Sequence, residues 1–359
     1  MKILNLLILL CFALNGFSQE SEPILLKNFR PVSVYAIPVT IPEKAKFPVI
    51  DMHSHAYARN SAELDNWVKT MDQSGITKTI ILTGTAGPKF DSLVGVYGKY
   101  PDHFELWCGF DYTGCEKQGF GPAAVKELER CYKKGAKGVG ELGDKGEGET
   151  YSKPVPGKGM HLDDARMKPL LQKCAELHMP INIHVADPYW MYLPTDSTND
   201  GLMNAVEWKI KLKPGMLDHG QLIKTLENAV RDNPKTVFIA CHFANCEYDL
   251  TKAGHLLDLY PNLYLDIAAR YAETATIPRY MAKFYNKYQD RLLYGTDMGL
   301  EKHIYQVTFR VLETLDEHFY ETELFGYHWS MSGFGLSDTI LEKLYKSNAL
   351  KIRKYEEEH

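Results

Sequence analysis

Short apolar runs alternate with amphipathic stretches along the chain from about residue 48 onward. The apolar runs predict strands, and they fall at Val49–His53, Lys78–Leu82, Glu105–Phe110, Ala136–Glu141, Pro180–His184, Thr236–His242, Leu263–Ile267 and Leu292–Asp297. The segments between them carry apolar residues three or four positions apart, which predicts helices. Examples are Ala62–Ser74, Pro122–Lys134, Met167–Leu177, Gly220–Asp232, Pro278–Tyr288 and Asp338–Arg353, the last with Ser337 as its N-cap.

This alternation of strand and helix predicts a parallel sheet. Eight units follow one another without a break that would separate two domains, so we expect one (β/α)8 TIM barrel of the α/β class. A doubly wound open sheet is the alternative. No Gly-rich phosphate-binding loop follows the first strand to support it.

Three connections are longer than the others: residues 142–162 after the fourth strand, 185–217 after the fifth and 298–336 after the eighth. Because each insertion follows a strand, all three should lie at the barrel face where active sites are built. The Gly- and Lys-rich stretch 142–159 is either a mobile lid or a solvated loop. Within the last insertion, residues 309–320 predict an amphipathic helix that carries Arg310 and Glu313 as a surface ion pair.

The first 18 residues have the layout of a secretory signal peptide: a positive charge, a nine-residue apolar run and small residues before a cleavage point after Ser18. We therefore expect a periplasmic or secreted protein, with an extended arm at 19–47 and the barrel at 48–359. The apolar run is too short to span a bilayer, and no later stretch approaches about 18 unbroken apolar residues, so no membrane span is expected.

The charge balance limits the classes of molecule that the protein is expected to bind. The 359 residues include 41 basic and 46 acidic side chains, a net charge of -5, with no dense cluster of Lys and Arg. This argues against a nucleic-acid binder and favours a small-molecule substrate, while a homodimer remains compatible with the sequence. Six cysteines remain after the signal peptide, and disulfide pairing stays open, Cys131 with Cys174 being one conceivable pair.

Histidine and acidic residues end several predicted strands. A two-residue strand period puts His53 and His55 on one side of the first strand, with Ile50 and Met52 on the other side facing helices. Other strands end in Glu141, His184, His242 and Asp297. Any one of these could be a satisfied core residue. Together, at one barrel mouth, they would be costly to bury without a cation, which predicts a metal site.

The sequence Asp51-Met52-His53-Ser54-His55, the strand-end His184 and His242, and the run Tyr294-Gly295-Thr296-Asp297 resemble the amidohydrolase superfamily. They are most similar to its amidohydrolase-related branch, which includes aminocarboxymuconate-semialdehyde decarboxylase. The resemblance extends from about Phe47 to Arg353. Its motifs are specific to the superfamily but say little about any one substrate.

The resemblance implies that His53, His55, His184 and Asp297 surround a divalent ion, usually zinc. It also implies that Asp297 accepts the proton of the activated water and that His242 orients this water or polarises the substrate. Zinc lowers the pKa of bound water from 15.7 to about 7. Relatives with two metals often use a carboxylated lysine on the fourth strand, but here Lys137 lies at the wrong end of that strand. Glu141 holds the mouth position, either bridging a second metal or hydrogen-bonding around a single one.

Candidate substrate-binding residues surround this site, although each could equally serve to hold a long loop in place. Aromatic side chains with one or two arginines suit a small, partly apolar substrate that carries a carboxylate. The candidates are Tyr57, Arg59, Trp190, Arg270 and His328.

The leading hypothesis is a secreted metal-dependent hydrolase that cleaves an ester, lactone or amide. The alternative is a metal-dependent non-oxidative decarboxylase of the same family, in which His242 or Asp297 would protonate the carbanion. Glu141 favours hydrolysis, because an extra carboxylate suits water chemistry better than an anionic substrate. Secretion favours it as well, because decarboxylation of ring acids is usually cytoplasmic. A non-catalytic binding protein is the third hypothesis, but none of the expected ligands is missing.

Overall fold

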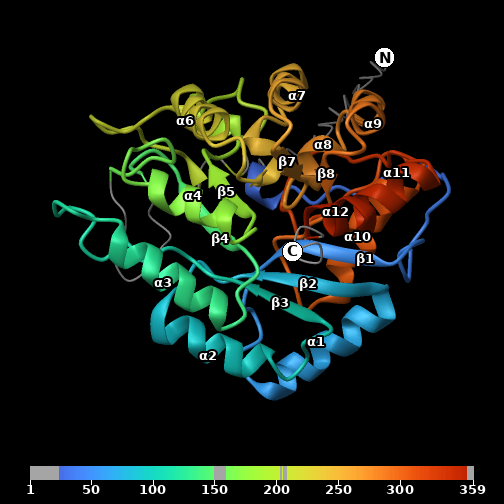
Figure 1. Ribbon diagram of the computed structural model, residues 1–359. Helices are drawn as coiled ribbons and strands as arrows, with labels where there is room; N and C mark the ends of the chain where they lie inside the picture. The colour runs from blue at the N-terminus through green and yellow to red at the C-terminus, as the bar shows by residue number, and fades with distance from the viewer. Residues whose placement is uncertain (1–23, 149–158, 203, 205–207, 354–359) are drawn as a thin grey trace, which may run out of the picture.

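The computed structural model describes residues 24–148, 159–202, 204 and 208–353. Its parallel strands form two hydrogen-bonded groups, in the order β1-β2-β3 and β4-β5-β6-β7-β8, with helices around the outside (Figure 1). The strands are β1 (Val49–Ser54), β2 (Ile76–Leu82), β3 (Phe104–Trp107), β4 (Val139–Asp144), β5 (Ile181–Val185), β6 (Phe238–Ala240), β7 (Leu263–Asp266) and β8 (Leu292–Leu293).

Helices alternate with these strands along the described chain. They are α1 (Ser61–Ser74), α2 (Gly87–Tyr97), α3 (Pro122–Lys133), α4 (Lys168–Glu176), α6 (His219–Asp232), α7 (Leu250–Leu259), α8 (Tyr271–Thr274), α9 (Pro278–Lys287), α10 (Lys302–Glu313), α11 (Asp338–Glu342) and α12 (Asn348–Arg353). A π-helical turn, Lys343–Ser347, joins α11 to α12. Short 3-10 turns lie at Leu26–Asn28, Tyr189–Tyr192 (η2) and His242–Asn245 (η3).

Two junctions join the strand groups into a ring. At the junction of β3 and β4, Cys108 bridges to Val139, and the Cys108 N–H donates to the Gly138 carbonyl at 3.0 Å. At the junction of β8 and β1, the Met52 N–H donates to the Tyr294 carbonyl at 2.9 Å. A few backbone hydrogen bonds and a bridge, rather than long ladders, therefore connect the two groups. The (β/α)8 barrel predicted from the sequence is the observed fold.

One apolar cluster consists of strand residues together with the closing helix α12: Ile50, Met52, Ile80, Leu82, Trp107, Ile239, Tyr264, Leu293, Ala349 and Ile352. Because the members come from strands around the ring, this cluster is the interior of the barrel. The prediction that Ile50 and Met52 face the helices is therefore wrong. The pairing of β1 with β2 shifts register between Asp51 and Ser54, so strict two-residue alternation does not hold along this strand.

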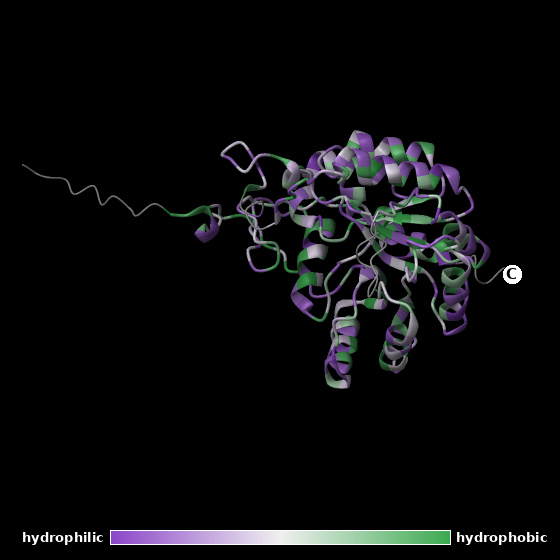
Figure 2. Ribbon diagram, turned by 90° about the vertical axis from the view of Figure 1, so that its left-hand side faces the viewer, coloured by the Kyte–Doolittle hydropathy of each residue, from purple (hydrophilic) through white to green (hydrophobic). Residues whose placement is uncertain are grey.

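Local sequence explains where the surrounding helices begin and end. The Asn60 side chain accepts a hydrogen bond from the Glu63 N–H and caps α1, which ends at Gly75 with φ 82°. Asp218 and Gln221 form a reciprocal capping box at the start of α6. The outer helices carry both apolar and polar residues (Figure 2), and in α6 the buried ones include Leu222, Leu226 and Val230.

The helix in the last insertion is α10. It covers residues 302–313, so it starts and ends earlier in the chain than the predicted helix at 309–320. The chain leaves the helix at Thr314, whose backbone is extended. The Arg310 Nε donates to Asp316 at 2.8 Å, whereas Glu313 accepts from the Lys46 N–H and the Tyr345 hydroxyl. The predicted ion pair between Arg310 and Glu313 is thus replaced by contacts with other partners.

The arm that precedes the barrel is fixed at its C-terminal end. The Thr40 N–H and hydroxyl donate to the Asp316 carboxylate at 2.7 and 2.9 Å, while Val32 and Val34 are largely exposed. Cysteines 108, 115, 131, 174, 241 and 246 are all buried and free, so Cys131 and Cys174 are not paired. Within the described part of the chain, every helix is too short or too polar to cross a bilayer.

Candidate metal centre

Six side chains from five strands converge at the carboxyl end of the barrel: His53, His55, Glu141, His184, His242 and Asp297. The backbone turns sharply where two of them emerge, with φ 57° at His242 and 60° at Asp297. Such left-handed conformations are costly for residues other than glycine and are concentrated at functional sites. A Cβ at Gly295 would lie 2.7 Å from the His53 Cβ, so a glycine is needed where β8 passes the first histidine.

The Glu141 carboxylate lies among all four imidazoles. Its Oε1 is 2.9 Å from the His184 Nδ1, 3.6 Å from the His242 Nε2 and 3.9 Å from the His53 Nε2. Its Oε2 is 3.4 Å from the His55 Nε2. The fourth strand thus supplies an acidic group at the middle of the cluster.

Asp297 faces Glu141 across the histidines of β1. Its Oδ1 lies 3.0 Å from the His55 Nε2 and 3.5 Å from the His53 Nε2, and its Oδ2 is 4.0 Å from the His242 Nε2. The Tyr57 hydroxyl donates to the Asp297 main-chain carbonyl at 2.6 Å. The side chain of Asp297 is 29% exposed, the largest exposure among the six, so it lies nearest to the opening.

The far ring nitrogens of three histidines are occupied, which directs their Nε2 atoms to the centre. The His55 Nδ1 donates to the Leu82 carbonyl at 2.9 Å, and the His242 Nδ1 donates to the Ala268 carbonyl at 2.8 Å. The His53 Nδ1 lies 2.9 Å from the Asp266 carboxylate. A protonated Nδ1 leaves the Nε2 lone pair available to a cation.

Asp266, at the end of β7, was missed in the sequence. Besides His53, it accepts hydrogen bonds from the His242 N–H at 3.0 Å and the Asn182 amide at 3.1 Å. It is fully buried and fixes residues of three strands. The sequence carries a signal for Asp266, because it is an acidic residue at a strand end like Glu141 and Asp297. The predicted strand extended one residue further, to Ile267, and therefore did not place Asp266 at its end.

Asp51, in the first motif, supports the site from behind. Its carboxylate accepts from the His53 N–H at 3.1 Å, the Thr296 N–H at 3.0 Å and the Thr296 hydroxyl at 2.7 Å. Burial raises the pKa of Asp51 to about 7, against the lowering effect of these hydrogen bonds. Asp51 therefore joins β1 to the segment that carries Asp297.

The electrostatics of the cluster favour a cation. Burial alone would raise the pKa of Glu141 and of Asp297, but the neighbouring imidazoles hold both well below their usual range. The same contacts raise the pKa of His55 to about 10, although burial opposes this. Ionised carboxylates surrounded by imidazoles that attract protons are a site where a metal ion could replace those protons.

The donor set fits a divalent ion. The ligand atoms of His53, His55 and Asp297 lie within 4.8 Å of one another, as do those of His53, Glu141, Cys241 and His242. The His53 Nε2 is completely buried and makes no hydrogen bond in the described structure. A buried, unpartnered acceptor pointing at two carboxylates is accounted for when a cation lies between them.

The predicted substrate residues lie in different environments. Tyr57 touches the site through Asp297. Arg270 is buried after β7, where its guanidinium donates to the Asn245 side chain and the Ala269 carbonyl and lies 3.9 Å from Glu247. Arg59 is exposed at the start of α1, and its N–H donates to Glu63.

Trp190 and His328 belong to the insertions after β5 and β8. Trp190 packs on Gly201 and meets the Tyr327 ring edge-to-face at 6.3 Å, which brings the two insertions together. His328 is half-buried beside Trp329. Most of the predicted lid at 142–159 lies outside the described residues. Its first part is held by Asp144, which accepts from the N–H groups of Gly146 and Gly148 at 3.0 Å.

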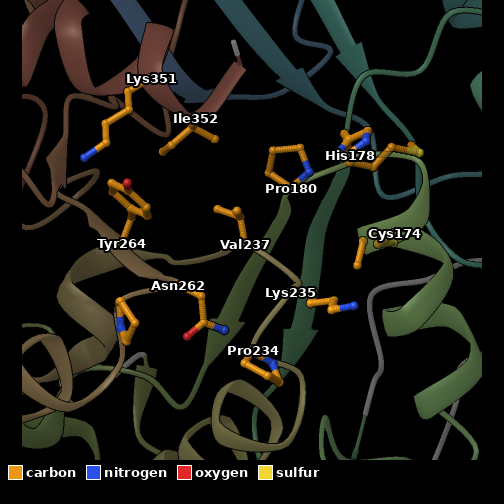
Figure 3. A pocket seen from close by; sticks show the side chains of 13 residues that line it. Cys174, His178, Pro180, Pro234, Lys235, Val237, Asn262, Tyr264, Lys351 and Ile352 are labelled. Atoms are coloured by element: carbon orange, nitrogen blue, oxygen red, sulfur yellow. The ribbon is translucent and has the colours of Figure 1, made fainter. Parts of the chain in front are cut away.

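A cavity of about 680 Å³ lies at the opposite end of the barrel (Figure 3). It is lined by residues before β5, β6 and β7 and by α12, including His178, Lys235, Tyr264, Lys351 and Ile352. Because catalytic residues of TIM barrels lie at the carboxyl ends of strands, this cavity belongs to the structural end.

The amidohydrolase family model matches residues 117–352, more than half of the chain, so the chain belongs to the amidohydrolase family. A sequence search of curated proteins finds no match.

Similar solved structures share the fold. A Staphylococcus aureus protein assigned as an amidohydrolase aligns with a TM-score of 0.54 at 16% identity, over 85% of this chain and 99% of its own. A dihydroxybenzoic acid decarboxylase from a Polaromonas species, described with bound manganese and 2-nitroresorcinol, aligns at 0.53 and 16%, over 86% and 98%. A 4-oxalomesaconate hydratase from Rhodopseudomonas palustris aligns at 0.50 and 14%, over 86% and 96%.

Proposed function

We propose that this amidohydrolase is a metal-dependent hydrolase that cleaves an ester, lactone or amide of a small substrate. One observation carries the proposal. The Glu141 carboxylate lies within 4 Å of a ring nitrogen of all four site histidines, opposite the second carboxylate, Asp297. Two carboxylates balance the charge of one divalent cation, so the centre would suit a neutral carbonyl group better than a substrate carboxylate.

His53, His55, His184 and Asp297 would hold the metal ion, and Glu141 would complete the set or bridge to a second ion. A divalent cation there supplies Lewis acidity, which acidifies water and polarises a carbonyl group. Zinc is the metal we propose, because three imidazole ligands suit zinc better than manganese, which prefers oxygen ligands. The bound manganese described for the Polaromonas decarboxylase makes manganese the competitor to test.

Asp297 would accept the proton of the attacking water and pass it to the leaving group. Its Oδ1 faces the β1 histidines, while its Oδ2 lies 4.0 Å from the His242 Nε2. Burial and the neighbouring His184 lower the pKa of His242, so this imidazole stays neutral and able to orient water or a carbonyl oxygen. Asp297 would thus supply the proton acceptor, and His242 would supply the group that orients the water or the carbonyl oxygen.

Tyr57, Arg270, Trp190, His328 and Arg59 remain our candidates for substrate contacts. The Arg270 guanidinium already donates to the Asn245 side chain and lies 3.9 Å from Glu247, so part of its hydrogen-bonding capacity is engaged before a substrate arrives. This supports a substrate in which any carboxylate is peripheral. Trp190 and the aromatic residues beside His328 would supply an apolar wall.

A metal-dependent decarboxylase is the second candidate. It is favoured by the buried Arg270, which would then bind the carboxylate of an acid. Several structural neighbours are also described as decarboxylases. A screen of esters, lactones, amides and aromatic acids, with carbon dioxide release monitored, separates the two reactions. We expect turnover of a neutral carbonyl substrate without carbon dioxide. Carbon dioxide from an acid, with no hydrolysis, would replace the hydrolase proposal by the decarboxylase.

We further propose export with cleavage after Ser18, supported by the layout of the first 18 residues. Cell fractionation and N-terminal sequencing should find a mature chain that begins at Gln19 outside the cytoplasm. A homodimer stays a prediction, which light scattering of the mature protein would test.

A further inference from the structure

His184 is held on both sides by acidic groups. Its Nδ1 lies 2.9 Å from the Glu141 Oε1, and its Nε2 lies 3.3 Å from the Asp187 Oδ1. The second distance lies just beyond the usual range of about 2.7–3.2 Å for an N–H···O hydrogen bond, so this contact is an ion pair of Asp187 with His184. The ring therefore turns its Nδ1 to the centre, the reverse of His53, His55 and His242, whose Nδ1 atoms face away.

Asp187 reaches His184 because the backbone turns back on itself after β5. Ala186 adopts φ 61°, a left-handed conformation after which the side chain of Asp187, three residues beyond His184, lies against the imidazole. Asp187 is 3% exposed, and its Oδ1 also accepts from the Lys145 Nζ at 2.6 Å. Its Oδ2 makes no hydrogen bond among the described residues. A buried carboxylate in this position is costly, so its retention needs a reason beyond packing.

Every other site histidine has an acceptor on its outer nitrogen. His55 and His242 use main-chain carbonyls, and His53 uses the Asp266 carboxylate. Asp187 lies on the corresponding side of His184, with its Oδ1 3.3 Å from the outer nitrogen. Such outer acceptors fix the tautomer and raise the basicity of the inner nitrogen.

We propose that Asp187 is a positioning residue for the metal centre: it binds the outer nitrogen of His184, directs the Nδ1 lone pair inward, and is itself held by Lys145. The inference rests on the proposed metal centre but not on the reaction that the centre catalyses. It assigns the loop after β5 a role in metal affinity.

The test is metal affinity of the full mature protein, stripped with a chelator and titrated with Zn²⁺ against a competing indicator. We expect Asp187→Ala to weaken Zn²⁺ binding by about 10- to 100-fold. Asp187→Asn should weaken it less, because the amide oxygen can still accept a hydrogen bond. Asp196→Asn is the matched control, since Asp196 lies in the same insertion and only caps Thr198. It should bind Zn²⁺ as the wild type does.

A second readout separates positioning from folding. The melting temperature of the metal-free variants should match that of the metal-free wild type, while the visible spectrum of their Co²⁺ forms should shift. Zn²⁺ binding by Asp187→Ala within twofold of the wild type would overturn the proposal while leaving the metal centre intact. If Asp187→Ala fails to fold, unchanged affinity and Co²⁺ spectrum in Asp187→Asn would overturn it instead. A wild type that binds no metal would overturn both proposals.

Discussion

The two ends of the barrel are built differently. At the carboxyl ends of the strands, residues other than glycine adopt left-handed backbone conformations after β5, β6, β7 and β8: Ala186, His242, Phe243, Ala244, Asn245, Ala269 and Asp297. Buried acidic groups and imidazoles fill the same end. At the amino ends, α12 closes an apolar interior, and a cavity of about 680 Å³ lies beside it (Figure 3).

The contrast indicates that the carboxyl end keeps groups that serve chemistry at a cost in folding stability. Strained backbone and buried charge each destabilise a fold, and they persist where function requires them. The amino end carries fewer such features, namely His178 with φ 53° and the buried Glu105 paired with Arg353, and its interior is an apolar cluster. Substitutions at the carboxyl end should therefore affect metal binding and turnover most, whereas those at the amino end should affect stability alone.

The largest expected effect follows from removing the paired imidazoles of β1. The double variant His53→Ala with His55→Ala should lose its metal ion and all activity, because it removes two nitrogen ligands from one centre. Metal content by elemental analysis measures the loss, with the exposed Arg279→Ala as the control. Full metal content in the double variant would show that the ion lies elsewhere.

The next effect concerns the proposed proton acceptor. Asp297→Asn keeps an oxygen near the β1 histidines but cannot take a proton, so it should retain metal while turnover falls by about 10²- to 10⁴-fold. Steady-state rates and metal content of the same sample provide the measurement. A variant that turns over at the wild-type rate would remove Asp297 from this role.

Sequence alone predicted much of this site, and the omissions have physical causes. The site residues found in this way are His53, His55, Glu141, His184, His242 and Asp297, because parallel strands bring their carboxyl ends together. The carbonyl groups that orient His55 and His242 leave no trace in a sequence, since every residue has a carbonyl. The inward packing of Ile50 and Met52 could not be foreseen, because the register shift in β1 depends on its neighbour strand.

At the amino end of the barrel, Ile352→Ala tests whether side-chain packing there stabilises the fold without affecting the active site. Ile352 is 2% exposed in the barrel interior and lines the cavity, so truncating it should cost about 2 to 5 kcal/mol of unfolding free energy. Metal content and kcat at low temperature should stay within twofold of the wild type. A tenfold loss of kcat in the folded variant would mean that the amino end also shapes the active site.

The smallest expected effect is the pH dependence contributed by Glu247, a buried acid near the metal centre. Burial raises the pKa of Glu247 from its ordinary value of 4.5 to about 7, against the lowering effect of Arg270. The folded protein thus keeps this proton between about pH 4.5 and 7, where the unfolded chain has released it. Stability therefore falls as pH rises through this window, by about 3 kcal/mol in all.

Glu247→Gln removes this titration. Relative to the wild type, the variant should gain about 3 kcal/mol of unfolding free energy between pH 4.5 and pH 8. Urea unfolding of the metal-free proteins at several pH values measures the difference, and the exposed Glu342→Gln serves as the control. A difference between variant and wild type that does not change with pH would mean that Glu247 is ionised throughout. In that case Arg270 would compensate it fully, and the carboxyl end would hold this charge at no cost to stability.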